Sequence, residues 1–243
     1  MGTSLIFISG ASGGIGDALA RTVPWDPARI VGISRSKPGA VDEHVEADLG
    51  DPSQWGKVRQ AFQREIGTGE WDRVVFVHAA GNVDPIGFAR EVDADAYQTN
   101  VLLNSAAPQV LGHHFLAATE GMSTPHYVVM LTSGAAKSVY PGWSSYGAAK
   151  AAVDQWVRNV GAEQDIRGGA RVLSVAPGTV DTDMQAMLRD TSEEQFPKRQ
   201  KFVDIHAEGK LTDPEQVARD IWSLLDRDLD NGAVVDLREV TNT

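Results

Sequence analysis

Short apolar runs alternate with longer amphipathic segments along the whole chain of 243 residues, and this alternation constrains the fold most strongly. Most of the runs are almost continuously hydrophobic, which is typical of parallel strands buried on both faces. The segments between them, for example 55–66 and 148–163, have the length and periodicity of helices. The apolar runs lie at 4–9, 29–34, 44–48, 73–79, 126–133, 171–177 and 233–237. The alternation predicts an α/β fold with a doubly wound, seven-stranded parallel sheet between two layers of helices.

No linker-like composition, internal repeat or low-complexity tract interrupts this pattern, so we expect a single domain over residues 1–243. One connection is unusually long. It runs from 178 to 212 and mixes charges with Met and Phe side chains. Because long inserts in compact domains are usually functional or mobile, we expect one or two small helices that cover the site as a lid at about 181–210.

Composition excludes several classes of function. The formal net charge of −11 argues against nucleic acid or an anionic membrane as a partner. The absence of cysteine excludes disulfides and thiolate catalysis, and we expect no metal site. The apolar runs are too short to span a bilayer, and the N-terminal residues do not resemble a signal peptide. A cytoplasmic enzyme or binding protein fits these observations.

A glycine-rich stretch, "SGASGGIG", follows the first apolar run and precedes a helical segment. In a parallel α/β sheet, the first strand–turn–helix unit is where a dinucleotide pyrophosphate meets the helix N-terminus. Glycine is needed there because backbone amides must approach the phosphates closely. An ordinary tight turn is the alternative, but the position after the first strand favours a nucleotide site.

The end of the second run indicates which dinucleotide binds. Versions of this turn that bind NAD carry an acidic residue about 20 residues further on, for the ribose hydroxyls. Here Ser34 stands at that place, and Arg35 and Lys37 follow. A guanidinium can pair with a 2′-phosphate, whereas a carboxylate would repel it. The sequence therefore predicts NADP(H), with a solvated basic loop as the alternative.

A tyrosine and a lysine stand four residues apart in "SSYGAAKAAVD". The segment reads as a helix, and residues i and i+4 lie on one helix face. Tyr146 and Lys150 should therefore point the same way, with only small side chains between them. An ammonium near a phenol stabilises the phenolate and lowers its pKa. We expect Lys150 to lower the pKa of Tyr146 in this way, so that Tyr146 can act as a general acid.

These motifs together resemble the short-chain dehydrogenase/reductase family over essentially the whole chain. "SGASGGIG" is similar to its TGxxxGxG turn, "YGAAK" to its YxxxK motif, and "PGTVDTDM" to its nicotinamide-holding segment. Asp48 matches its adenine-contacting aspartate. Ser133 precedes Tyr146 by the spacing typical of the family, and Asn100 stands where it has a fourth catalytic residue.

The resemblance implies a Rossmann fold and the catalytic residues Asn100, Ser133, Tyr146 and Lys150. Ser133 would donate a second hydrogen bond to the substrate carbonyl, and Asn100 would hold a water that relays protons through Lys150. The cofactor site would comprise Gly10, Ser12, Gly13, Gly14, Ile15, Gly16, Ser34, Arg35, Asp48, Leu49, Ala79, Ala80, Gly81, Tyr146, Lys150, Pro177, Gly178, Val180, Thr182 and Met184.

Segments outside this shared set, such as "AEGKLTDPEQVA" and "NGAVVDL", resemble the sepiapterin and benzil reductase branch of the family. This likeness implies an NADPH-dependent carbonyl reductase of α-dicarbonyl or α-hydroxycarbonyl compounds. The substrate pocket would include Gly134, Tyr140, Trp143, Met184 and Asp236. Trp143 could stack on an aromatic substrate or be packing, and Asp236 could anchor substrate amino groups or bond to the backbone.

"HAAG" at 78–81 departs from the family's NNAG, and we interpret His78 as a structural substitution. The pair His113–His114 is interpreted as helix surface and packing. Relatives associate through long helices that here would be 97–118 and 146–163, and the small residues from Gly147 to Ala152 suit close packing. A homodimer or homotetramer is expected. Two alternatives are an NAD-dependent alcohol dehydrogenase and a non-catalytic sensor of NADP(H).

Overall fold

A computed structural model describes residues 2–240, and its seven strands form one parallel sheet. The strand order is β3-β2-β1-β4-β5-β6-β7, and every neighbouring pair is parallel. The strands are β1 (Thr3–Ser9), β2 (Ala28–Ser34), β3 (Glu43–Glu46), β4 (Trp71–His78), β5 (His126–Leu131), β6 (Arg171–Ala176) and β7 (Val234–Asp236). Each of the seven apolar runs forms a strand, so the predicted fold class is confirmed. The order reverses between β1 and β4, and in doubly wound sheets a ligand binds beside that reversal, at the carboxyl ends of the strands.

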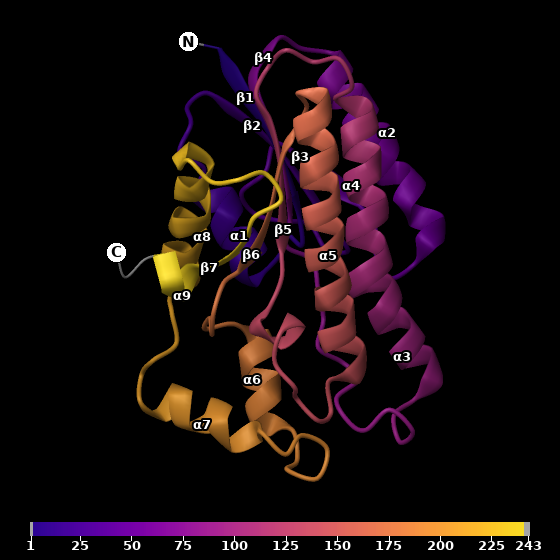
Figure 1. Cartoon of the computed structure of the whole chain (residues 1–243), viewed down its shortest axis with the longest axis vertical. Coiled ribbons are helices and arrows are strands. Elements are labelled where there is room, and N and C mark those ends of the chain that lie inside the picture. The colour runs from indigo at the N-terminus through magenta and orange to yellow at the C-terminus, as the bar shows by residue number, and fades with distance from the viewer. Residues whose placement is uncertain (1, 241–243) are drawn as a thin grey trace.

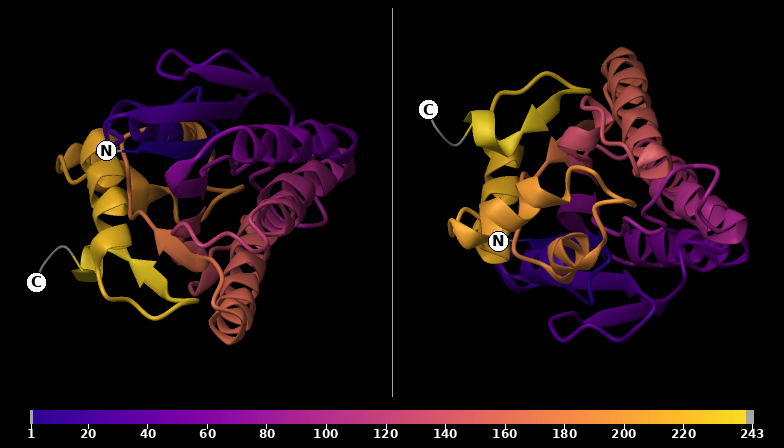
Figure 2. Two further views of the ribbon diagram at one scale, coloured as in Figure 1. Left: turned by 90° about the horizontal axis from the view of Figure 1, so that it is seen from above. Right: turned by 90° about the horizontal axis from the view of Figure 1, so that it is seen from below.

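Helices cover both faces of the sheet and make the fold three-layered (Figures 1 and 2). The helices are α1 (Gly14–Arg21), α2 (Trp55–Gly67), α3 (Ala94–Val101), α4 (Ala107–Ala118), α5 (Ser144–Arg167), α6 (Asp183–Asp190), α7 (Arg199–Ala207), α8 (Pro214–Ser223) and α9 (Leu237–Val240). Buried side chains of α2, α4 and α5 pack on one face, and those of α1 and α8 pack on the other. The alternating directions of buried strand residues supply both cores.

The long connection after β6 contains two short helices, α6 and α7, which lie beyond the carboxyl end of the sheet (Figure 1). Phe196 and Phe202 from this segment are buried against Trp143 at the start of α5. The short helices expected from the sequence are therefore present. The assignment of one domain with a lid stays a prediction. Within the described residues, no helix has both the length and the apolarity to cross a membrane.

Candidate active site

The turn between β1 and α1 requires glycine at two places. Gly10 has a φ of 71°, and a Cβ there would lie 2.8 Å from the backbone nitrogen of Ala80. A Cβ on Gly16 would overlap the carbonyl oxygen of Gly10, because the first turn of α1 packs directly on the end of β1. Gly13, the N-cap, has no side chain to satisfy the first amides of α1. The N-terminus of α1 is thus a tight, backbone-lined cradle that suits a phosphate.

The residues around this cradle fit a nicotinamide dinucleotide. A Cβ on Gly14 would lie 3.3 Å from the Cγ2 of Thr182, so the loop after β6 approaches the turn. Other residues that the sequence assigned to the cofactor line a pocket beside it, namely Ile15, Pro177, Gly178, Val180, Thr182 and Met184. Across the turn, Ala79 and Ala80 donate backbone hydrogen bonds to Ser9. Small residues therefore line the path that a dinucleotide would take along the strand ends.

Ser34 and Arg35 lie at the end of β2, where a ribose would be bound. Ser34 is buried, and its hydroxyl donates to the carbonyl of Ser36 at 2.7 Å. His44 of β3 lies against it, with Nε2 3.1 Å from the Ser34 carbonyl oxygen. Arg35 is exposed and has no ion pair among the described residues. The cationic side chain is therefore available to solvent, and His44 is a part of this corner that the sequence reasoning missed.

Asp48 and Leu49 follow β3 on the same side. The Asp48 Oδ1 accepts a hydrogen bond from the backbone of Gly50 at 2.8 Å, and the Asp48 amide donates to Gln54 at 3.0 Å. Leu49 is buried in the core of that face. The loop is thus fixed by its own hydrogen bonds, which orient the Asp48 carboxylate.

Ser133, Tyr146 and Lys150 come together at the carboxyl end of β5. Ser133 caps the turn after the strand and accepts from the amide of Ala135 at 3.2 Å. Tyr146 and Lys150 lie on one face of α5, as their spacing predicts, with exposed fractions of 6% and 5%. Ser133 lies close enough to the Tyr146 hydroxyl that hydrogen bonding between them would lower the pKa of Tyr146. The Lys150 Nζ lies 5.7 Å from the Tyr146 ring centre and donates to the carbonyl of Leu131 at 2.9 Å.

The predicted net lowering of the Tyr146 pKa is wrong for this structure. Burial raises the pKa of Tyr146 above its usual value, and the Ser133 hydrogen bond only opposes that rise. Burial also lowers the pKa of Lys150 to about 8, against the attraction of Asp154. The sequence showed the spacing but not the burial, and desolvation disfavours the charged form of both groups. Tyr146 is consequently a protonated phenol at neutral pH.

Asn100 lies at the end of α3, immediately before a π-helical turn at Leu102–Ala106. Its Nδ2 donates to the carbonyls of Asn82 and Asp84, and its Oδ1 is buried without a hydrogen-bond partner. Asn104, which the sequence reasoning missed, accepts from the amide of Asn82 and donates to the carbonyls of Asn82 and Asn100. π-Turns are frequent at functional sites, and this one places both amides against the 82–85 loop. The proton relay through Asn100 stays a prediction.

His78 is buried in the sheet, with 1% of its surface exposed. Its Nδ1 lies 3.0 Å from the Ser9 hydroxyl on the neighbouring strand, and that hydroxyl also accepts from the amide of Ala80. Burial and the charge of Lys150 lower the pKa of His78 to about 3. The histidine is therefore neutral and joins β1 to β4, in agreement with its structural interpretation.

We expect His78 to make the protein acid-labile. Because the pKa falls from 6.5 to about 3 on folding, the unfolded chain binds more protons between these values, and stability falls as the pH falls. From pH 7 to pH 5, the free energy of unfolding should drop by about 2 kcal/mol more in the wild type than in His78→Asn. Urea unfolding at both pH values measures the difference. His113→Asn, which changes an exposed histidine, is the control and should behave like the wild type. If the free energy of unfolding falls equally from pH 7 to pH 5 in the wild type and in His78→Asn, the prediction is contradicted.

A pocket of about 220 Å³ opens beside Ser133 and Tyr146. Four of the five residues predicted for the substrate line it, namely Gly134, Tyr140, Trp143 and Met184. Rings of Tyr140, Trp143, Tyr146, Phe196 and Phe202 pack on one another at its wall, with neighbouring centroids 4.7 to 6.3 Å apart. Trp143 therefore both packs in this aromatic cluster and faces the pocket.

Asp236, the fifth predicted substrate residue, is outside the pocket lining. Its carboxylate accepts from the Arg238 Nε at 2.9 Å, the Arg238 Nη2 at 2.5 Å and the Arg238 backbone amide at 3.1 Å. These hydrogen bonds lower its pKa. Arg238 and Lys201 line the pocket instead, and the sequence reasoning missed both. No local motif marks either residue, because they reach the pocket from α9 and α7.

The two adjacent histidines of α4, His113 and His114, have ring centroids 5.6 Å apart at the helix surface. Among residues 2–240, no group of three or more His, Cys, Asp or Glu side chains could hold a metal ion.

The sheet, the phosphate cradle and the Ser133–Tyr146–Lys150 cluster together define the class of α/β oxidoreductases that bind a nicotinamide dinucleotide. A family model described as short chain dehydrogenase matches residues 4–193. The chain therefore belongs to the short-chain dehydrogenase/reductase family, as the sequence motifs indicated.

Curated relatives cover nearly the full length. The chain is 32% identical over 239 residues to a benzil reductase ((S)-benzoin forming) of Bacillus subtilis, covering 97% of this chain and 98% of the relative. It is 28% identical to the sepiapterin reductase of Rattus norvegicus, covering 99% and 98%. A crystal structure of the KRED1-Pglu enzyme has a TM-score of 0.80 at 26% identity, covering 96% of this chain and 100% of that one. These relatives confirm the resemblance to the benzil and sepiapterin reductase branch that the sequence indicated.

Proposed function

We propose that this protein is an NADPH-dependent carbonyl reductase that acts on the ketone of α-dicarbonyl or α-hydroxycarbonyl compounds. The observation that carries the proposal is a buried Tyr146 that lines an aromatic pocket together with Ser133. A phenol that is protonated at neutral pH can donate its proton to a carbonyl oxygen, as reduction requires.

In this mechanism, the nicotinamide dinucleotide supplies the hydride when bound. Ser133 and Tyr146 both donate hydrogen bonds to the substrate carbonyl oxygen, which fixes its orientation and stabilises the charge that develops there. Tyr146 then transfers its proton to that oxygen. Lys150, with a pKa lowered to about 8, holds a positive charge near the phenol at neutral pH and stabilises the phenolate that proton transfer leaves. We propose that Asn100 of α3, whose buried Oδ1 has no hydrogen-bond partner, holds a water that relays protons through Lys150.

Two features support an aromatic substrate. Tyr140, Trp143 and Phe202 present rings to the pocket, and stacked or edge-on ring contacts are favourable. The relatives named for benzil reduction act on a compound with aryl groups beside adjacent carbonyls. Because Asp236 pairs with Arg238, its carboxylate is poorly placed to anchor the amino groups of a pterin. We therefore favour aryl dicarbonyls over pterins.

The test follows the loss of NADPH absorbance with benzil, a sepiapterin-like α-hydroxyketone, a small diketone and an aliphatic ketone. Selective turnover of benzil would support both the reaction and the substrate class. Turnover of the aliphatic ketone alone would retain the reaction and discard the substrate class. No turnover with any carbonyl would favour a sensor of NADP(H).

Cofactor choice should depend on the end of β2. In the double variant Ser34→Asp/Arg35→Ala, a carboxylate replaces the hydroxyl and the exposed guanidinium is lost, so a 2′-phosphate is repelled and not paired. We expect the ratio of kcat/KM with NADPH to that with NADH to fall at least about 100-fold. Steady-state kinetics with both cofactors measure the ratio. Lys57→Ala, which removes a cation of α2 that donates to the carbonyl of Glu46, is the control. An unchanged ratio in the double variant would contradict NADP(H) selectivity.

We further propose a single domain, residues 1–243, whose lid at about 181–210 covers bound substrate. The exposed sides of α4 and α5 lie next to each other (Figures 1 and 2) and would join copies of the chain into a homodimer or homotetramer. The small residues from Gly147 to Ala152 on α5 allow close helix approach. A cytoplasmic location is part of the same proposal.

A further inference from the structure

Two cationic side chains line the pocket beside Ser133 and Tyr146, although the protein is strongly acidic. The chain has 33 acidic and 22 basic residues. Among the described residues that line the pocket, however, Lys201 and Arg238 are cations and none is a carboxylate. From the composition of the whole chain, acidic side chains would be expected more often than basic ones in the pocket lining. Local charge of this kind raises the concentration of an oppositely charged substrate at a concave site.

Arg238 lies close to the catalytic hydroxyls. Its Nη2 is 3.7 Å from the position that a Cβ on Gly134 would take, and Gly134 follows Ser133 directly. Its Cγ and Cδ lie 3.4 Å from the corresponding Cβ position of Gly178. Asp236 binds the Nε and Nη2 of the guanidinium, which fixes the direction of the side chain. Arg238 thus runs past Gly178 and ends beside Gly134, within the pocket lining.

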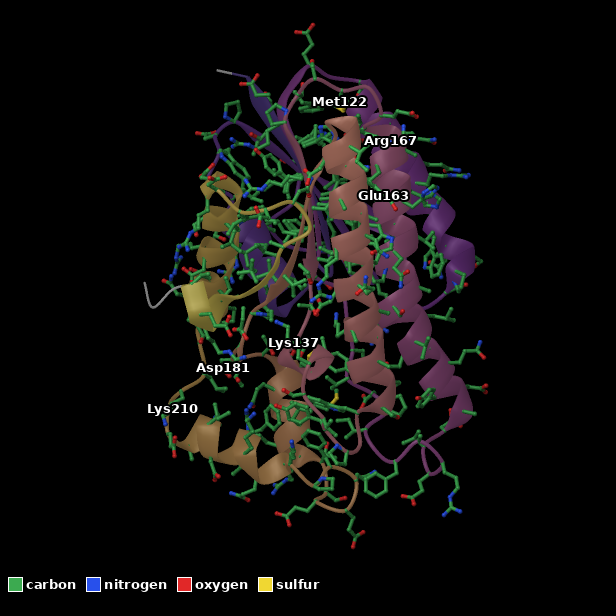
Figure 3. The ribbon with its side chains drawn as sticks, in the orientation of Figure 1. Met122, Lys137, Glu163, Arg167, Asp181 and Lys210 are labelled. Carbon is green, nitrogen blue, oxygen red and sulfur yellow. The ribbon has the colours of Figure 1, made fainter. Side chains whose placement is uncertain are left out.

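Lys201 reaches the same pocket from α7. Its Nζ lies 2.8 Å from the Tyr140 hydroxyl and 5.3 Å from the centre of the Tyr140 ring. Arg238 lines the same pocket from α9, so cations from two separate elements lie in one lining. A further cation, Lys137, lies between the carboxyl end of the sheet and α6 (Figure 3), but outside the lining of this pocket. The aromatic rings and the cations thus form two parts of one lining.

We propose that this pocket selects aromatic ketones that carry a carboxylate beside the carbonyl, of which an aryl 2-oxo acid is the simplest. The ketone would bind Ser133 and Tyr146, the ring would lie on the aromatic wall, and the carboxylate would pair with Arg238 and Lys201. The inference rests on the proposed function and narrows its substrate class. The ketone gains a hydride from NADPH and a proton from Tyr146 and becomes the 2-hydroxy acid, while the carboxylate stays unchanged.

The test compares phenylglyoxylate with its methyl ester, which keeps the ring and ketone and removes the charge. We expect the wild type to have a kcat/KM for the acid at least about 10-fold above that for the ester. Arg238→Gln and Lys201→Gln should each lower the value for the acid by about 10- to 100-fold, mainly through KM, and that for the ester by no more than about threefold. Arg238→Lys should recover part of the loss.

Lys210→Gln is the matched control, because this cation pairs with Glu208 just beyond α7, away from the pocket (Figure 3), and both substrates should behave as in the wild type. Benzil is assayed in parallel. If benzil is reduced but the acid is no better than the ester, the inference is overturned and the proposed function stands. If no carbonyl is reduced, the proposed function fails and the inference with it. Equal losses on acid and ester, with weaker NADPH binding in Arg238→Gln, would assign Arg238 to the cofactor and overturn the inference.

Discussion

Replacing Tyr146 by Phe is expected to lower kcat by about 10³-fold or more with every carbonyl substrate, because the general acid is lost. The ring that packs on Trp143 and lies near Lys150 is kept, so folding should be retained. Binding of NADPH should change little, since only the hydroxyl is removed. Steady-state kinetics give kcat, and fluorescence titration gives the Kd of NADPH.

Tyr127→Phe is the matched control for this change. Tyr127 lies on β5, outside the pocket lining, and packs against the core on the α1 and α8 side, so its hydroxyl should not affect turnover. Retention of more than about a tenth of wild-type kcat in Tyr146→Phe would show that another group protonates the carbonyl. Loss of NADPH binding in that variant would instead indicate that the phenol acts by holding the cofactor.

Replacing Gly16 by Ala is expected to cause the largest loss of stability in the first turn. The added Cβ would overlap the carbonyl oxygen of Gly10, and neither backbone can move without separating α1 from β1. Overpacking against backbone should cost at least about 3 kcal/mol, or prevent folding. Thermal or urea unfolding measures this loss. If the variant remains folded, NADPH binding should weaken strongly, since the phosphate cradle is distorted.

Gly13→Ala provides the comparison within the same motif. A Cβ at Gly13 would meet nothing within 4 Å, and its φ of −171° suits any residue. Its stability should stay within about 1 kcal/mol of the wild type. Equal stability of Gly16→Ala and Gly13→Ala would show that the first turn of α1 can accommodate a Cβ against the end of β1.

The sequence predicted the fold well because hydrophobic periodicity reports burial directly. All seven apolar runs became strands, including the short one at β7, since strands buried on both faces need continuous apolar residues. The predicted helix at 97–118 is interrupted by a π-turn, because Asn100 and Asn104 bind the 82–85 loop there. No propensity signal marks such a turn, which depends on a contact with a distant segment.

The site was predictable where the residues stand in one short segment. Tyr146 and Lys150 share a helix face because of helical geometry, and the glycines of the first turn are required by backbone clashes within a few residues. The pKa of Tyr146 was not predictable, because spacing says nothing about how deeply α5 buries the hydroxyl. The same holds for His78, whose pairing with Ser9 joins two strands that are far apart in the chain.

The sequence by itself thus determined the class of fold, the glycine turn between β1 and α1, and the shared helix face of Tyr146 and Lys150. Only the tertiary structure decided which side chains complete the pocket. Lys201 of α7 and Arg238 of α9 line the pocket. Asp236 lies outside the lining and forms an ion pair with Arg238, two residues further along the chain. The physical reason is the range of the forces involved. Helix geometry and glycine sterics act between near neighbours, whereas desolvation and pocket charge depend on chain segments that meet only after folding.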